Sequence, residues 1–296
     1  MSSKPSATPA PGKIPSPSEP EPNPFPRFVE LGGGCPPVVR LGLATRGNTQ
    51  IAADDVALAV ERGVNYLNWC GYDDGIAKAL RSKIIDRNRV VVAMQLDARD
   101  AASAAAELED AFRTLGTRRI DVVTFYYVEH KSEWDEIARR DGALQVLKAE
   151  KQQGRVGLIG LTTHQRRLAA EWAEEKKFDL LMVRYNAAHR GAEQDVFPVT
   201  ERLGMPVVVY TAQRWGALAR RTQDDPPESP PPAAIEWYRF ALAHPAASVV
   251  LMAPNGRSEL EANLKLLDDW RPPTPAEFEA MSQHGQRVRK NAGRFP

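Results

Sequence analysis

The chain has 296 residues, of which 43% are hydrophobic and 26% charged, so it can bury one sizeable core and suits a single domain. Its 39 Lys and Arg residues nearly balance its 38 Asp and Glu residues, which gives no reason to expect nucleic acid or an acidic membrane surface as a partner. Cys35 and Cys70 are too few for a disulfide framework or a cysteine-based zinc site, and the five histidines show no metal-ligand spacing.

The N-terminal segment is rich in proline. Residues 1–26 hold nine of the 24 prolines, a composition that cannot bury enough apolar surface to offset its conformational entropy. We therefore predict a disordered tail over residues 1–34, either a solvated extension or a docking segment, followed by one folded unit over residues 35–296. Because the segment lacks the apolar core of a signal peptide and no apolar run approaches 18 residues, we expect a soluble cytoplasmic protein.

From Val39 onward, apolar runs of strand length alternate with segments of helical period. The expected strands are Val39–Ala44, Val64–Trp69, Arg89–Leu96, Ile120–Tyr127, Val156–Leu161, Asp179–Tyr185, Pro206–Thr211 and Ala247–Met252. The expected helices cover residues 52–62, 74–83, 101–115, 132–152, 165–176, 192–203, 233–243 and 258–269. Eight such cycles predict an α/β fold, a closed (β/α)8 TIM barrel with its site at the C-terminal ends of the strands.

Two segments depart from this rhythm. Asp224–Pro232 packs five prolines into nine residues, which predicts a stiff loop on the C-terminal face that can act as a lid. Residues 274–290 have helical composition and are expected to lie across the barrel as a C-terminal extension. The run Gly32-Gly33-Gly34 lacks the strand and helix context of a phosphate-binding loop, so we interpret it as a loop before the barrel.

The second predicted strand carries a motif. Gly63-Val64-Asn65-Tyr66-Leu67 is followed by the polar residue Asn68, and this pattern resembles the second strand of the aldo-keto reductases, in which the polar residue is an Asp. The resemblance extends with gaps from about Val39 to Asn263. It implies a barrel that binds NAD(P) and reduces carbonyl compounds with a Tyr proton donor, a Lys and an Asp that lower the pKa of that Tyr, and a His that orients the carbonyl.

Three of these four catalytic positions have changed. The resemblance places Asn68 at the Asp position, Gln95 at the Lys position and Tyr126 at the His position, and all three replacements are neutral. Tyr72 is the candidate for the proton donor, but it follows Asn68 by four residues where the family has five, so it is either a displaced catalytic Tyr or an exposed loop residue. A substitute acid would be needed for activity, and His189 or His164 is the candidate.

The cofactor positions implied by the resemblance are partly kept. Hydroxyls and glycine survive where the family binds the nicotinamide and the pyrophosphate, whereas Met182 replaces a Gln and Ala262 a Glu. The candidate cofactor residues are Thr162, Thr163, Thr211, Gly216, Leu218, Arg257 and Asn263. Glu259 stands where an Arg or Gln is common and would repel a 2′-phosphate, although Arg257 could compensate.

Cationic residues follow the sixth and seventh strands. Because these two strands are adjacent, we expect the residues after them to surround one opening of the barrel. They would form a substrate or anion site from Arg184, Asn186, Arg190, Arg214 and Trp215 beside His189. Guanidinium groups at close range repel one another unless carboxylates or a bound anion compensate them, and Glu193 and Asp195 are the candidate carboxylates. The sequence leaves open whether this is a functional anion site or a structural salt-bridge cluster.

Two functions fit these observations. In the first, the protein is a pseudoenzyme of the family, with little standard carbonyl reduction but with a retained pocket for a small-molecule ligand or a nicotinamide cofactor. In the second, it is an active NAD(P)H-dependent oxidoreductase with a rebuilt proton relay. The fold alone does not separate them, because such barrels host many chemistries.

Overall fold

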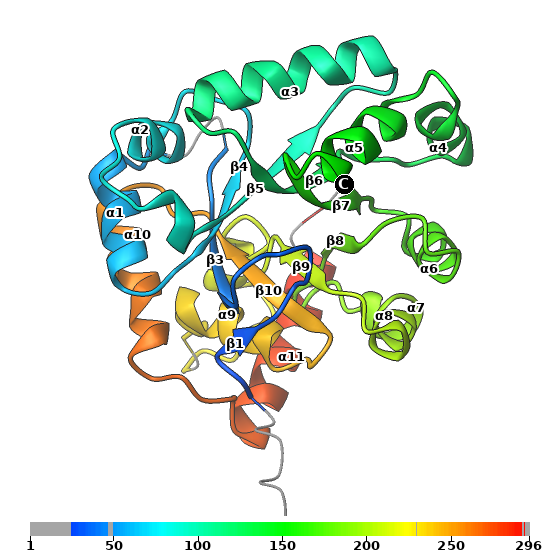
Figure 1. Cartoon of the computed structure of the whole chain (residues 1–296). Coiled ribbons are helices and arrows are strands. Elements are labelled where there is room, and N and C mark those ends of the chain that lie inside the picture. Colours follow the sequence, from blue (N-terminus) through cyan, green and yellow to red (C-terminus); the bar gives the residue numbers. More distant parts are fainter. Residues whose placement is uncertain (1–24, 47–49, 229, 292, 294–296) are drawn as a thin grey trace, which may run out of the picture.

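The computed structural model describes residues 25–46, 50–228, 230–291 and 293. Eight parallel strands form a closed barrel in the order β3, β4, β5, β6, β7, β8, β9 and β10, with β10 paired to β3, and helices surround it (Figure 1). The strands are β3 (Leu41–Ala44), β4 (Tyr66–Trp69), β5 (Val91–Leu96), β6 (Ile120–Phe125), β7 (Val156–Thr162), β8 (Leu180–Arg184), β9 (Val207–Tyr210) and β10 (Ala247–Met252). The predicted (β/α)8 barrel and its eight strands are confirmed.

The helices largely follow the predicted ranges, but two of the predicted helices are each divided into a pair. They are α1 (Ala53–Glu61), α2 (Gly75–Arg81), α3 (Ala101–Leu115), α4 (Lys131–Ala138), α5 (Ala143–Gln152), α6 (Arg166–Glu174), α7 (Ala192–Asp195), α8 (Phe197–Leu203), α9 (Ala234–Leu242), α10 (Arg257–Leu264) and α11 (Pro275–Asn291). The expected helix over residues 132–152 ends early and restarts after Gly142. A Cβ atom at Gly142 would lie 2.3 Å from the Ile137 carbonyl oxygen, so this close turn requires glycine.

The segment before the barrel closes its N-terminal end. Residues 1–24 of the predicted tail lie outside the described residues, but residues 25–34, which the prediction also placed in the tail, belong to the fold. Strand β1 (Phe28–Val29) pairs with β2 (Val38–Val39), and Leu31 is buried among the side chains inside the barrel. Gly33 sits under β7 with φ +61, where a Cβ atom would lie 2.6 Å from Leu158.

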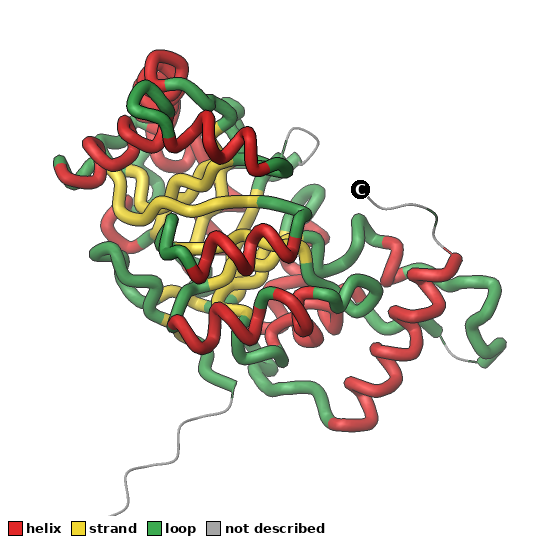
Figure 2. Tube along the Cα trace, turned by 90° about the vertical axis from the view of Figure 1, so that its right-hand side faces the viewer, coloured by secondary structure: helices red, strands yellow, loops and turns green. Residues whose placement is uncertain are grey.

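The barrel has two layers of buried side chains. Residues on one face of each strand fill the barrel interior, among them Tyr66, Val91, Val122 and Val208. Residues on the other face pack against the surrounding helices in a larger cluster. The inward side chains alternate along each strand, and Figure 2 shows the strands enclosed by helices. This packing fixes the C-terminal strand ends, where the cavity described below opens.

Helix α11 is fastened to the proline-rich loop that was predicted to act as a lid. Asp225 in this loop has a buried side chain that accepts hydrogen bonds from Arg287 Nε at 2.6 Å and the Thr222 N–H at 2.5 Å, and lies 3.0 Å from His284 Nδ1. The other ring nitrogen of His284 lies 2.9 Å from the Leu218 carbonyl oxygen. The start of this loop is therefore anchored to α11.

We expect the Asp225 anchor to stabilise the fold in a pH-dependent way. Burial by itself raises the pKa of Asp225, but hydrogen bonds from the Thr222 N–H, Arg287 and His284 outweigh burial and lower it from 3.8 to about 2. Because the folded-state pKa is depressed, this stabilisation is present above about pH 4 and is lost as the pH falls toward 2. Asp225→Asn should lower the free energy of unfolding at pH 7 by about 2 kcal/mol, measured by urea denaturation.

The neighbouring carboxylate provides the control. Asp224 binds Lys290 and Asn291 at the surface, so Asp224→Asn should change stability far less and leave the acid unfolding midpoint nearly unchanged. Equal effects of the two substitutions would show that the buried anchor has no special role.

Candidate functional site

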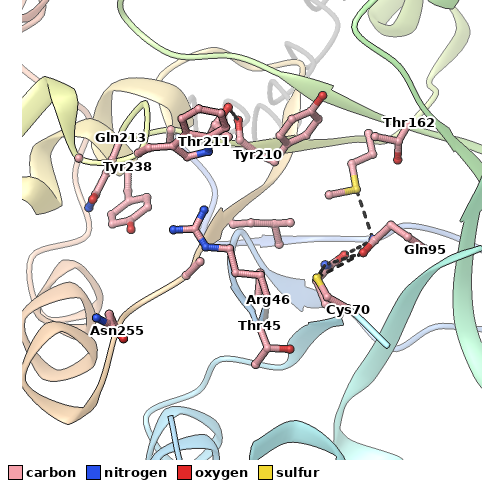
Figure 3. Close-up of a pocket in the computed structure, with 18 of the residues that line it drawn as sticks. Thr45, Arg46, Cys70, Gln95, Thr162, Tyr210, Thr211, Gln213, Tyr238 and Asn255 are labelled. Atoms are coloured by element: carbon pink, nitrogen blue, oxygen red, sulfur yellow. Dashed lines mark hydrogen bonds between the residues drawn. The ribbon is translucent and has the colours of Figure 1, made fainter. Parts of the chain in front are cut away.

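A cavity of about 500 Å³ opens at the C-terminal ends of the barrel strands, a volume typical of small-molecule and cofactor sites. Figure 3 shows side chains from several strands and their following loops pointing into it. Its lining residues are Ala44, Thr45, Arg46, Asn68, Cys70, Gln95, Tyr126, Tyr127, Thr162, Met182, Tyr210, Thr211, Ala212, Gln213, Trp215, Gly216, Arg220, Tyr238, Leu251, Ala253, Asn255 and Glu259. The cavity thus lies at the C-terminal ends of the strands, where the barrel fold predicts the site.

A pair of carboxamides lies at one end of this cavity. Gln95 Nε2 donates to Asn68 Oδ1 at 2.9 Å, and Asn68 Nδ2 donates back to Gln95 Oε1 at 3.3 Å. The strands place them together, because Asn68 pairs with Ala93 in the register of β4 and β5, two residues before Gln95. Each amide offers both a donor and an acceptor, so the two side chains satisfy one another without any charge.

Two sulfur atoms flank this amide pair. Cys70 Sγ lies 3.5 Å from Gln95 Oε1, and Gln95 Nε2 lies 3.6 Å from Met182 Sδ, contacts that Figure 3 draws as dashed lines. Burial, followed by the nearby Asp74 carboxylate, raises the pKa of the Cys70 thiol to about 12. The thiol therefore stays protonated at neutral pH and is a poor nucleophile.

Aromatic rings form the wall beside the amide pair. The Tyr126 ring packs against the Tyr127 ring at a centroid distance of 4.0 Å, and the Tyr127 ring packs against the His164 ring at 4.4 Å, both in a tilted arrangement. Burial is the main cause that raises the pKa of Tyr126 and of Tyr210 above their ordinary values. Tyr127 and Tyr210 were not among the predicted site residues. Tyr210 is the last residue of β9 and Tyr127 follows the end of β6, and these positions are the signal that could have identified them.

Tyr72 does not reach the cavity. Its side chain is 56% exposed and is not among the lining residues, while its carbonyl oxygen accepts a 2.6 Å hydrogen bond from Trp69 Nε1. The shortened loop thus holds Tyr72 by its backbone and turns its ring to solvent. Of the two readings left open by the sequence, the geometry agrees with the exposed loop residue.

The predicted cofactor residues separate into two groups. Thr162, Thr211 and Gly216 line the cavity. The others do not line it: Leu218 is buried, Thr163 Oγ1 accepts from the Gln165 N–H, Arg257 pairs with Asp55, and Asn263 is buried beside Tyr238. The sequence missed six further lining residues: Thr45, Arg46, Gln213, Arg220 and Asn255 from segments that follow strands, and Tyr238 from helix α9.

Buried hydroxyls in the cavity wall lack partners within the described part of the chain. The Oγ1 atom of Thr162 and the phenol oxygen of Tyr210 are both buried without a hydrogen bond, a state that costs free energy unless a ligand or water binds them. The wall after β9 is also strained, because Thr211, Arg214 and Trp215 have φ values of 57°, 49° and 53°. Such backbone is uncommon for non-glycine residues and often occurs at functional sites.

The predicted cation cluster does not surround the main cavity, which corrects that expectation. Among its members only Trp215 lines the cavity. Arg190 forms a two-point ion pair with Glu193 at 2.7 and 3.0 Å, which is the structural salt bridge that the sequence allowed. Arg214 is buried and donates to the Gly293 carbonyl oxygen at 2.9 Å.

The remaining members of that cluster lie elsewhere. Arg184 and His189 border a small separate cavity with His164 and Arg166, and Asn186 is fully buried, where Nδ2 donates to the Thr211 carbonyl oxygen. Burial and the nearby Arg184 lower the pKa of His189 to about 4, so it is neutral at pH 7. His189 also borders the small cavity and is not a lining residue of the main cavity, in which a substitute acid would have to act.

The described residues contain no group of three or more His, Cys, Asp or Glu side chains that could hold a metal ion. Nor does any helix in the described ranges have the length and apolar character needed to span a membrane. The described lining residues supply amides, hydroxyls, aromatic rings, a thiol, a thioether and the charged side chains of Arg46, Arg220 and Glu259.

Comparison with known proteins identifies the family. The model of the aldo/keto reductase family matches residues 39–236, about two thirds of the chain. The chain belongs to the aldo/keto reductase family. A search of curated protein sequences finds no match.

Solved structures of other proteins share the fold of this family member. The holo form of aldo-keto reductase AKR11C1 from Bacillus halodurans is similar with a TM-score of 0.68 at 19% identity, over 88% of this chain and 96% of that one. The glycerol dehydrogenase AKR11B4 from Gluconobacter oxydans has a TM-score of 0.68 at 16% identity, over 89% and 96%. An aldo/keto reductase from Brucella melitensis has a TM-score of 0.66 at 16% identity, over 88% and 98%. At these identities the likeness concerns the fold alone.

The uncharged amide pair predicts how charged substitutions at its two positions change the stability of the fold. Asn68→Asp and Gln95→Lys should each lower the free energy of unfolding by about 1–3 kcal/mol, because each removes a hydrogen bond and leaves a charge without a counter-charge in a mostly buried site. The double variant should recover part of the loss through an ion pair, so a double-mutant cycle by thermal or urea unfolding should give a favourable coupling energy.

A surface amide provides the control for this cycle. Gln152 is exposed near the end of α5, so Gln152→Lys should leave stability nearly unchanged. Additive effects of Asn68→Asp and Gln95→Lys would contradict the direct contact between the two side chains.

Proposed function

We propose that this aldo/keto reductase-family protein binds a nicotinamide dinucleotide in the cavity and has little of the carbonyl reduction standard for the family. The observation that carries the proposal is the reciprocal Asn68–Gln95 amide pair at the floor of the site. By the resemblance, these two positions hold the carboxylate and ammonium that make a Tyr acidic. A neutral amide pair keeps the shape of that arrangement and removes its charge.

The described lining groups with shifted pKa values are poor proton donors at neutral pH. No histidine is among the described lining residues. Cys70 has a pKa of about 12, and burial raises the pKa values of Tyr126 and Tyr210. Loss of positioned acid-base catalysis typically costs about 10²- to 10⁴-fold in rate, and loss of electrostatic support for a developing alkoxide adds to that.

The cavity does fit the cofactor that the family resemblance implies. The unpartnered hydroxyls of Thr162 and Tyr210 supply polar partners at the nicotinamide end, and Thr211 and Gly216 stand at the positions expected under the pyrophosphate. Arg46 and Arg220 also line the cavity and are suitable partners for phosphate. In Figure 3 the Arg46 guanidinium lies between the Gln95 end and the Asn255 end. When bound, the nicotinamide would supply a hydride.

We predict that the purified protein binds NADH, with a dissociation constant above about 1 μM, yet turns over simple aldehydes far more slowly than about 1 s⁻¹. Isothermal titration calorimetry measures the binding, and NADH absorbance measures turnover. Thr162→Val should weaken NADH binding about 3- to 10-fold by removing the unpartnered hydroxyl. Thr163→Val is the matched control, because the Thr163 hydroxyl faces the next loop.

Two results would oppose the proposal. Absence of NADH binding would refute the proposal that the cavity holds a nicotinamide dinucleotide. Turnover of several aldehydes at 1 s⁻¹ or more would restore a catalytic function, and loss of that rate in His189→Ala but not in Tyr72→Phe would identify a rebuilt relay.

A further inference from the structure

The end of the cavity opposite the amide pair is acidic. Glu259 and Asn255 line it together with Tyr238. Glu259 belongs to the first turn of α10, and its Oε2 atom accepts a 2.8 Å hydrogen bond from the Asn255 N–H. This contact holds the carboxylate beside the N-terminus of α10, so its position does not depend on a ligand.

Glu259 occupies a place that would otherwise suit a phosphate. The first N–H groups of a helix have no partner within the helix and attract anions, phosphate included. Here the Glu259 carboxylate, which belongs to this helix, accepts from the Asn255 N–H, one residue before the N-cap Gly256. An incoming phosphate would meet both an occupied donor and a fixed negative charge.

The cation that was expected to compensate Glu259 is used elsewhere. Arg257 Nε lies 2.5 Å from Asp55 Oδ1, and the other Asp55 oxygen accepts from the Ala52 N–H at 2.7 Å. Arg257 thus fastens α10 to the start of α1, and it is not a lining residue of the cavity. Its charge is committed to this helix contact.

Arg46, which lines the cavity as Arg220 does, lies toward the middle of the cavity. Arg46 acts on groups at both ends, since it lowers the pKa values of Tyr238 and Cys70 against the larger effect of burial. This intermediate position suits a pyrophosphate rather than a group at the far end. A carboxylate at the far end can instead accept hydrogen bonds from ribose hydroxyls, as acidic residues do in other dinucleotide sites.

We propose that Glu259 makes this pocket selective for a dinucleotide without a 2′-phosphate, NAD(H), over NADP(H). The inference rests on the proposed function, because it concerns the same cavity. Glu259 acts as a built-in anion at the α10 N-terminus, excluding a phosphate and accepting ribose hydroxyls.

Calorimetric titration of the full chain with NADH and NADPH tests this proposal. The unmodified protein should bind NADH at least about 10-fold more tightly than NADPH, and added salt should narrow the difference because it screens repulsion. Glu259→Gln should raise NADPH affinity about 5- to 10-fold and change NADH affinity much less. The glutamine can still accept from the Asn255 N–H, so the loop before α10 is preserved.

Glu261 provides the matched control on the same helix. Its side chain is 58% exposed and is not among the described lining residues, so Glu261→Gln removes the same charge without changing the NADH to NADPH ratio. Equal or tighter binding of NADPH by the unmodified protein would overturn the proposal, as would an unchanged ratio in Glu259→Gln. Binding of neither dinucleotide would instead refute both the proposed function and this inference.

Discussion

The site depends on two side-chain amides that hydrogen-bond to each other across neighbouring strands. Asn68 and Gln95 satisfy their polar atoms mutually, so the barrel mouth needs neither a carboxylate nor an ammonium at these positions. Buried charges require partners, whereas a closed amide pair is self-sufficient. The surrounding thiol and phenol groups are also neutral at physiological pH, because burial favours their uncharged forms, and the thioether of Met182 carries no ionisable group. The result is a polar cavity with little capacity to move protons.

The charged groups of the cavity lie away from this floor. Arg46 occupies an intermediate position and Glu259 the far end, so binding and chemistry draw on different regions. An uncharged floor combined with charged walls suits recognition of a phosphate-containing ligand better than acid-base catalysis. The unpartnered hydroxyls of Thr162 and Tyr210 add to this picture, since a ligand would satisfy them.

The sequence predicted the barrel well because its signals are local. Runs such as Val156–Leu161 and Ala247–Met252 are apolar, of strand length and bounded by turns, and they match β7 and β10 closely. The Gly63–Asn68 motif predicted Asn68 at a strand end, and the register of β4 and β5 brings it beside Gln95 at the cavity. The hairpin of β1 and β2 was missed, since two-residue strands carry no periodicity and proline-rich composition dominates that segment.

Side-chain direction after the strands was beyond the sequence. Arg190 and Arg214 follow strands as site residues do, yet one pairs with Glu193 and the other donates to the Gly293 carbonyl near the end of α11. Glu193 is only three residues from Arg190 and was a candidate partner, whereas Gly293 is distant in the sequence. Only the folded loops decide whether such a side chain contacts the cavity or another part of the chain. The most direct test of a neutral site is the pH dependence of NADH affinity, measured by calorimetry from pH 6 to pH 9. Our account predicts a flat profile, within about twofold, because the groups at the cavity floor keep their uncharged forms across this range; a steep change with a midpoint near neutrality would reveal a titrating group and contradict it.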